Sequence, residues 1–101
     1  MPNILDVLGY KIYFWSNENF PLEPIHVHIS QQPHQNATKV WILSDGSVEL
    51  CNNKDKIPNK MLKKLLQTIE IYSDDIINKW EEHFNDITFK DEISREETIE
   101  R

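Results

Sequence analysis

The sequence predicts an α+β fold, with a four-stranded, mainly antiparallel sheet and two C-terminal helices packed on one face. Three observations predict it. Apolar and polar residues alternate in several short segments of the first half of the chain, which is typical of strands. Asp45-Gly46 lies between two such segments, and this dipeptide favours a tight hairpin turn. After Ile57 the apolar period changes to that of an amphipathic helix.

Four segments have the branched and aromatic content that is typical of strands, and they span residues 10–15, 23–31, 38–43 and 48–51. Successive side chains of a strand leave on opposite faces of the sheet. In the second segment, three branched apolar residues therefore face a core, while His26 and His28 project together from the other face. By the same alternation Lys11 shares a face with Tyr13 and Trp15, and Lys39 shares one with Trp41.

Two helices are expected after the sheet. Ile57-Pro58 opens the first helix, because proline at the first helical position loses no hydrogen bond. The apolar arc of this helix contains Met61, Leu62, Leu65, Leu66, Ile69 and Tyr72. Ser73 is placed to cap the second helix. The apolar stripe of the second helix contains Ile76, Ile77, Trp80 and Phe84.

Length and charge indicate one α+β domain over residues 1–90, followed by an acidic tail at residues 91–101 that we expect to be flexible. The formal net charge of −6 argues against nucleic-acid binding by the whole surface, although a local basic patch overrides such an average. The single cysteine, Cys51, excludes an intramolecular disulfide and favours a reducing compartment. No apolar run fits a signal peptide or a membrane span, so we expect a cytoplasmic protein without a membrane partner.

Five short sequence features form a recognisable pattern through their order and their spacing along the chain. They are Met1-Pro2 followed by Gly9, the segment Pro24-Ile25-His26-Val27-His28, the turn Asp45-Gly46, the helix start Ile57-Pro58, and Trp80. With these features the chain resembles the bacterial family known as domain of unknown function 4160 over residues 1–84. It departs from the family pattern at Leu22 and Ile25, where members often carry a further histidine and a second proline.

The resemblance implies a biological setting. Members of this family resemble the toxin half of small toxin–antitoxin-like gene pairs, and their usual neighbour belongs to domain of unknown function 2442. We therefore expect an antitoxin-like protein, encoded by the neighbouring gene, as the partner of this chain. We also expect action on RNA or on the translation machinery, with RNA as a second partner.

His26 and His28 admit three uses. As general acid and base they suit cleavage of a ribose phosphodiester, with Lys11 or Lys39 stabilising the charged intermediate, and this use predicts a metal-independent ribonuclease without a cofactor. As ligands of a divalent metal such as zinc they need a third and usually a fourth donor, with His34, Glu23, Glu49, Cys51 and His83 as candidates. As polar residues of a solvent-facing strand they contact a partner, which makes the protein a non-enzymatic protein-binding or metal-binding module.

Two further groups of residues are candidates for binding. Tyr13, Trp15 and Trp41 suit stacking against unpaired bases, anchoring of a protein partner, or burial in a core. Lys60, Lys63 and Lys64 continue a basic cluster that begins at Lys54 and Lys56. Such a cluster binds phosphate or an acidic antitoxin, or forms a solvated helix face.

Overall fold

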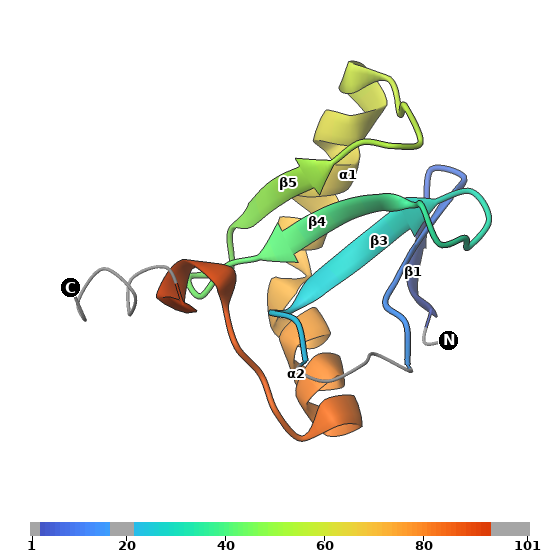
Figure 1. The fold of residues 1–101 in the computed structure, drawn as a ribbon. Coiled ribbons are helices and arrows are strands. Elements are labelled where there is room, and N and C mark those ends of the chain that lie inside the picture. Colours follow the sequence, from blue (N-terminus) through green and yellow to red (C-terminus); the bar gives the residue numbers. More distant parts are fainter. Residues whose placement is uncertain (1–2, 17–21, 94–101) are drawn as a thin grey trace.

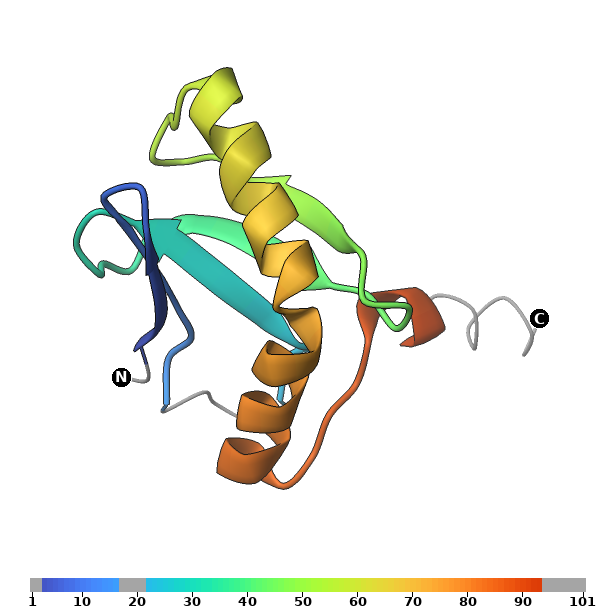
Figure 2. The ribbon, with the colours of Figure 1, turned by 180° about the vertical axis from the view of Figure 1, so that it is seen from behind.

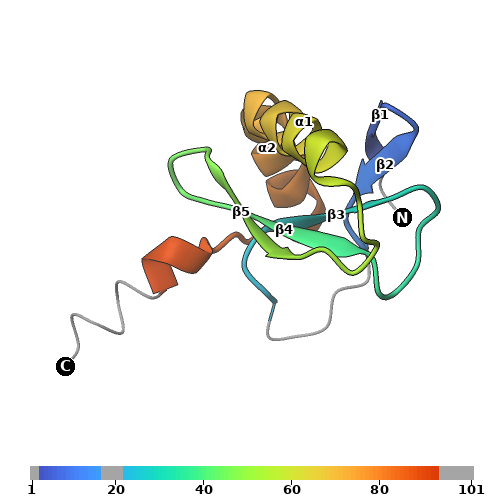
Figure 3. The same cartoon turned by 90° about the horizontal axis from the view of Figure 1, so that it is seen from above.

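The computed structural model describes residues 3–16 and 22–93 of the chain. Its strands are β1 (Asn3–Val7), β2 (Tyr10–Tyr13), β3 (His26–Ser30), β4 (Thr38–Ile42) and β5 (Val48–Asn52), and its helices are α1 (Asn59–Ile71) and α2 (Ser73–Phe84) (Figure 1). The strands lie in chain order, and every neighbouring pair is antiparallel. Seen from above, both helices lie on one side of the sheet (Figure 3). The predicted α+β class is confirmed.

The predicted number of strands is wrong, because the sheet has five strands in the described part of the chain rather than four. The fifth is β1, which we expected to be an apolar lead-in. Leu8 and Gly9 join β1 to β2 with φ angles of 53° and 84°, and two positive φ angles are what a tight hairpin turn requires. Leucine rarely adopts a positive φ, so Gly9 alone looks like the end of a segment and the turn goes unnoticed.

The face of the sheet toward the helices forms the core, as the alternation of apolar residues predicts. Ile12 pairs with Ile29 across β2 and β3, and Val27 pairs with Val40 across β3 and β4. The two helices follow one another across this face of the sheet (Figure 2). The fully buried residues of this cluster are Ile12, Ile25, Val27, Ile29, Val40, Ile42, Leu65, Ile69, Ile76 and Trp80.

Ser73 does not cap α2, which is a second correction. Tyr72 is the residue before the helix, and no side chain caps the N-terminus of α2 by a hydrogen bond. Ser73 is buried instead against the β4–β5 hairpin, where a Cβ added to Gly46 would lie 3.0 Å from the Ser73 Oγ. Gly46 has φ +87°, so both the turn and this close approach require glycine. Neither helix of the described residues is long and apolar enough to cross a bilayer.

The chain that follows α2 returns to the sheet (Figure 1). The Ile25 N–H donates to the Thr88 carbonyl at 3.0 Å, which brings this segment to the start of β3. Residues 90–93 form a helical turn, and the Asp91 carboxylate accepts hydrogen bonds from the Ser44 backbone and hydroxyl at 3.1 and 2.5 Å. Asp91, the first residue of the predicted tail, is thus bound to the β4–β5 hairpin, and residues 94–101 lie outside the described residues.

Candidate functional site

The face of the sheet opposite the helices carries both histidines of β3. Their ring centroids lie 5.1 Å apart, and the imidazoles share this face as the strand period predicts. The register places Tyr13 of β2 beside His28 and Trp41 of β4 beside His26. The rings of Trp15 and Tyr13 are nearly perpendicular, with 5.4 Å between their centroids. The three aromatic residues singled out in the sequence therefore surround the histidine pair.

Both histidines are buried. Only 1% of His26 and 7% of His28 are exposed to solvent, which contradicts the expectation of a solvent-facing strand. Trp41 and Trp80 enclose the His26 ring, with centroids 5.8 and 5.4 Å away. The ring of Tyr13 lies 5.7 Å from that of His28. Aromatic side chains from β2, β4 and α2 thus cover most of the surface of two imidazoles that the sequence alone predicts to be exposed.

Burial determines the protonation state of the pair. It lowers the pKa of His26 from 6.5 to about 4, partly opposed by a hydrogen bond to the Pro24 carbonyl and reinforced by the charge of Lys39. Burial and then Lys39 also lower the pKa of His28. The His26 Nδ1 lies 2.9 Å from the Pro24 oxygen, and a carbonyl can only accept, so Nδ1 carries the hydrogen. His26 is therefore neutral at pH 7, with the lone pair on Nε2.

The histidines form the floor of a pocket of about 340 Å³, which is within the range of small-ligand sites. It is lined by Trp15, Glu23, His26, His28, Gln35, Asn36, Ala37, Lys39, Cys51, Asn52 and Lys54. Of the residues predicted for the site, the pocket brings together the two histidines, Lys39 and Trp15. The sequence interpretation missed Lys54 as a pocket residue, and it considered Glu23 and Cys51 only as metal donors.

Lys39 is a cation whose position is fixed. Its Nζ donates to the Glu23 carboxylate at 2.5 Å and lies 4.4 Å from the centroid of the Trp41 ring. Burial by itself would raise the pKa of Glu23, but the hydrogen bond from Lys39 and the positive charge of Lys39 outweigh it and lower that pKa. The carboxylate is therefore ionised at neutral pH, and the pocket presents one anchored charge pair beside two neutral imidazoles.

Other predicted site residues lie elsewhere. Lys11 pairs with Asp6 of β1 at 3.1 Å and does not line the pocket. Tyr13 is fully buried, and its hydroxyl bonds the Ser30 hydroxyl at 2.9 Å. It packs beside His28 and does not line the pocket. Trp41 packs on His26 without lining the pocket. The remaining predicted residues, Lys60, Lys63 and Lys64, are exposed on α1.

Metal coordination by the pair requires at least one more donor. Within residues 3–16 and 22–93, no group of three or more His, Cys, Asp and Glu side chains is arranged to hold a metal ion. Three of the donors proposed from the sequence bond other groups, since His34 contacts Asp55, His83 contacts the Ser16 carbonyl, and Glu49 pairs with Lys90. Glu23 and Cys51 line the same pocket as the histidines.

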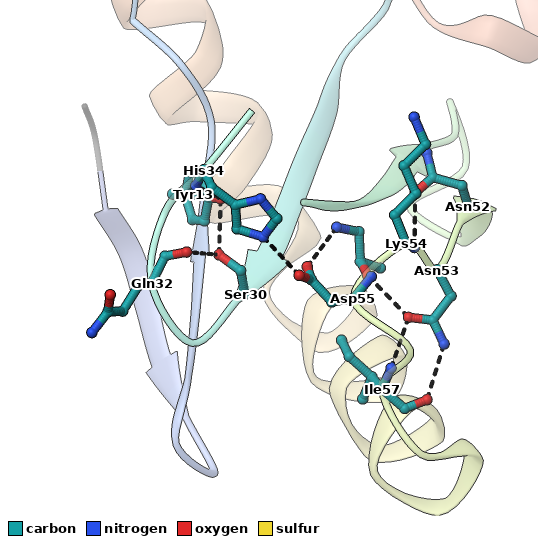
Figure 4. Close-up of polar contacts among 10 residues, drawn as sticks. Tyr13, Ser30, Gln32, His34, Asn52, Asn53, Lys54, Asp55 and Ile57 are labelled. Carbon is teal, nitrogen blue, oxygen red and sulfur yellow. Dashed lines mark hydrogen bonds and ion pairs between the residues drawn. The ribbon is translucent and has the colours of Figure 1, made fainter. Parts of the chain in front are cut away.

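A polar network joins the loop between β3 and β4 to the loop between β5 and α1 (Figure 4). The His34 Nε2 lies 2.6 Å from one oxygen of Asp55, whose other oxygen accepts from the Thr38 N–H at 2.8 Å. The Tyr13 hydroxyl accepts from the His34 N–H at 3.3 Å. This network holds the β3–β4 loop, which supplies Gln35, Asn36 and Ala37 to the pocket. No sequence pattern connects His34 with Asp55, because they come from different loops.

We expect the buried state of His26 to make stability depend on pH. The unfolded chain has the ordinary pKa of 6.5, and the folded pKa is about 4, so the unfolded state binds more protons between these values. The stabilisation is complete above pH 6.5 and is lost as pH falls through this window, by about 3 kcal/mol. Urea denaturation over this pH range measures it.

The control is the exposed His83, which lies outside the pocket. His83→Gln should keep the pH dependence of the wild type, and His26→Gln should make it shallower, because only the lowered pKa of His28 then remains. An equal pH dependence in both variants would exclude His26 as the cause.

A family model with the description Domain of unknown function (DUF4160) matches residues 9–81. This range contains β2 to β5, α1, most of α2 and all residues that line the pocket. No curated protein and no solved structure matches the chain.

Proposed function

This chain belongs to the DUF4160 family, and from that membership and the pocket we propose that it is the toxin-like half of a bacterial toxin–antitoxin-like pair that acts on RNA in the cytoplasm. One observation carries the RNA part of the proposal: two neutral imidazoles, a fixed lysine and a tryptophan line the same pocket. The gene pairing that the family resemblance implies supports the toxin part.

The pocket has the groups that an unpaired nucleotide needs. Trp15 offers an aromatic surface for stacking, which is tolerant of base identity. Lys39 and Lys54 offer positive charge to a phosphate. The amides of Gln35 and Asn36 can donate to and accept from the edges of a base. Together these groups fit one nucleotide of a single strand.

The chemistry that follows is transfer of the phosphodiester to the neighbouring 2′-hydroxyl. A neutral imidazole takes the 2′-hydroxyl proton, the 2′-oxygen bonds to phosphorus, and the bond from phosphorus to the 5′-oxygen breaks. The imidazolium then gives its proton to the leaving 5′-oxygen, so the products are a 2′,3′-cyclic phosphate and a 5′-hydroxyl. Lys39 stabilises the negative charge that develops on the phosphoryl oxygens. Because both pKa values are lowered, we assign the first proton transfer to a base rather than to a pre-charged pair.

Expression of the chain alone is therefore expected to arrest growth, and the purified protein should cleave single-stranded RNA in the presence of chelator. Lys39→Gln should reduce the cleavage rate on the order of 10²-fold, because it removes the fixed charge from the pocket. Lys11→Gln is the matched control, since Lys11 lies outside the pocket. Harmless expression, or equal rates in the two variants, would contradict the proposal.

We also expect a stable complex with the antitoxin-like protein that the neighbouring gene encodes. A neutralising partner acts by direct contact, so co-expression should restore growth, and the two proteins should elute together in gel filtration. Growth restored without any complex would show that the neighbour acts indirectly. Absence of both effects would remove the toxin–antitoxin pairing from the proposal while leaving RNA cleavage to be judged by its own assay.

A further inference from the structure

Lysines gather in the segment that leads from β5 into α1. Residues 54–64 contain five lysines against one acid, Asp55, in a chain whose formal net charge is −6. We call these lysines the lysine ridge, and its members are Lys54, Lys56, Lys60, Lys63 and Lys64. The charge of this segment is thus opposite to that of the chain as a whole.

The charges of the ridge are available for a ligand. All five lysines are exposed, and none forms an ion pair with a residue that the structure describes. The nearby acid, Asp55, is occupied by His34 and by the Thr38 N–H. By contrast, Lys11, Lys39 and Lys90 each pair with a carboxylate. Unpaired lysines of this density repel one another unless an anion lies across them.

The ridge begins at the pocket. Lys54 lines the pocket, so it belongs to both. Lys60, Lys63 and Lys64 are spaced by three and four residues in α1 and therefore share one helix face, opposite the buried Leu62 and Leu65. The connection from β5 rises from the level of the sheet to that of the helices (Figure 3). A flexible chain that leaves the pocket at Lys54 can follow this connection around the sheet to the lysines on the outward face of α1.

The composition of the ridge favours phosphates over a protein. Its exposed neighbours include Pro58, Asn59 and Gln67, and none of the large exposed hydrophobic residues of the described chain lies within residues 54–64. Protein interfaces are enriched in aromatic residues and depleted of lysine. Lysine is instead a common point charge for phosphate. The pocket beside Trp15 has room for an unpaired base, which favours a single strand over a duplex.

We infer that the ligand of this protein is single-stranded RNA, with one nucleotide in the pocket and the adjoining phosphates bound along the lysine ridge. The inference rests on the proposed function and deepens it, since it names the substrate class and the path of the strand. Binding along the ridge is electrostatic and independent of base sequence. Selectivity then comes from the pocket.

The test is the salt dependence of RNA binding. Fluorescence anisotropy with a labelled oligouridine of about 12 nucleotides gives the affinity between about 50 and 200 mM salt. The triple variant Lys56→Gln, Lys60→Gln, Lys64→Gln should bind more weakly at low salt, and its slope of log K against log salt should be shallower by about 2, since each phosphate contact to a single strand contributes about 0.7. The matched control, Lys11→Gln, Lys79→Gln, Lys90→Gln, changes the net charge equally outside the ridge and should keep the wild-type slope.

Each of the other outcomes of this experiment would overturn one part of the inference. Equal slopes in the two triple variants would overturn the ridge, and the proposed function would stand if Trp15→Ala still weakened RNA binding. Equal affinity for a duplex of the same length would overturn the single-strand assignment. Ridge-dependent binding of polyglutamate, tighter than that of RNA, would assign the ridge to an acidic protein. No binding of RNA by the wild type would remove the proposed function together with this inference.

Discussion

Replacement of Trp80 by alanine is expected to lower the free energy of unfolding by about 3–5 kcal/mol. Trp80 is fully buried and joins α2 to the rest of the core. Its ring centroid lies 4.6 Å from that of Phe84 and 5.1 Å from that of Phe14 in the chain after β2. A domain of this size has a total stability of about 5–15 kcal/mol, so the loss of these contacts and the cavity left behind take a large part of it. Equilibrium unfolding in urea measures the change.

Two further variants make this result specific. Lys79→Ala changes the preceding exposed residue of α2 and should leave the free energy of unfolding within about 0.5 kcal/mol of the wild-type value. Trp80→Phe keeps part of the ring volume and removes the indole Nε1, which is buried without a hydrogen-bond partner among the described residues. It should therefore cost less than Trp80→Ala. If Trp80→Ala unfolded at the same urea concentration as Lys79→Ala, the docking of α2 described above would be wrong.

Replacement of His26 or His28 by asparagine is expected to reduce the rate of RNA cleavage by about 10²–10⁴-fold, which is the usual effect of losing a general base. The same replacements should relieve the growth arrest. Asparagine rather than alanine is the useful change, because both imidazoles are buried and alanine would leave cavities. The unfolding midpoint of each variant separates loss of activity from loss of fold. His83→Asn is the control, since His83 lies outside the pocket.

The pH profile and the response to chelator separate the possible roles of the pair. A base with a pKa of about 4 stays neutral from pH 7 down to about 5, so activity should persist there and fall only as pH approaches 4. A histidine with the ordinary pKa would lose activity near 6.5 instead. If the pair bound a metal, chelator would mimic the mutations and added metal would reverse the loss. Wild-type activity in both asparagine variants would exclude the catalytic and the metal roles together.

Much of the fold could be predicted from local rules. The two-residue period of a strand places Ile25, Val27 and Ile29 on one face and the histidines on the other, whatever the rest of the chain does. The helical arc around Leu65 and the Asp45-Gly46 hairpin depend on equally local geometry. β1 was missed because its turn places a leucine, Leu8, at a positive φ, and no propensity rule anticipates that choice.

The candidate site depends on contacts between residues that are distant in sequence, which local rules do not predict. Alternation predicts which face His26 occupies, but its burial comes from Trp41 and Trp80, which are distant in sequence. The same holds for the fixed charge, because Lys39 reaches Glu23 only through the pairing of β3 with β4. The lowered pKa values follow from this burial. A pair that looks like an exposed acid and base is therefore found as two neutral groups.

The strand order has a consequence for how the protein folds. Since each strand pairs with its neighbours in the chain, the sheet has low contact order, and its pairing closes only short loops at a small entropic cost. The contacts of Phe14 with Trp80 and Phe84 span most of the described chain and are among the last to close by the same reasoning. During synthesis from the N-terminus, the complete sheet can therefore form while α2 is still being made. Until Trp80 arrives, part of the apolar face stays open to water, and this is the stage at which we expect the nascent chain to be most prone to aggregation.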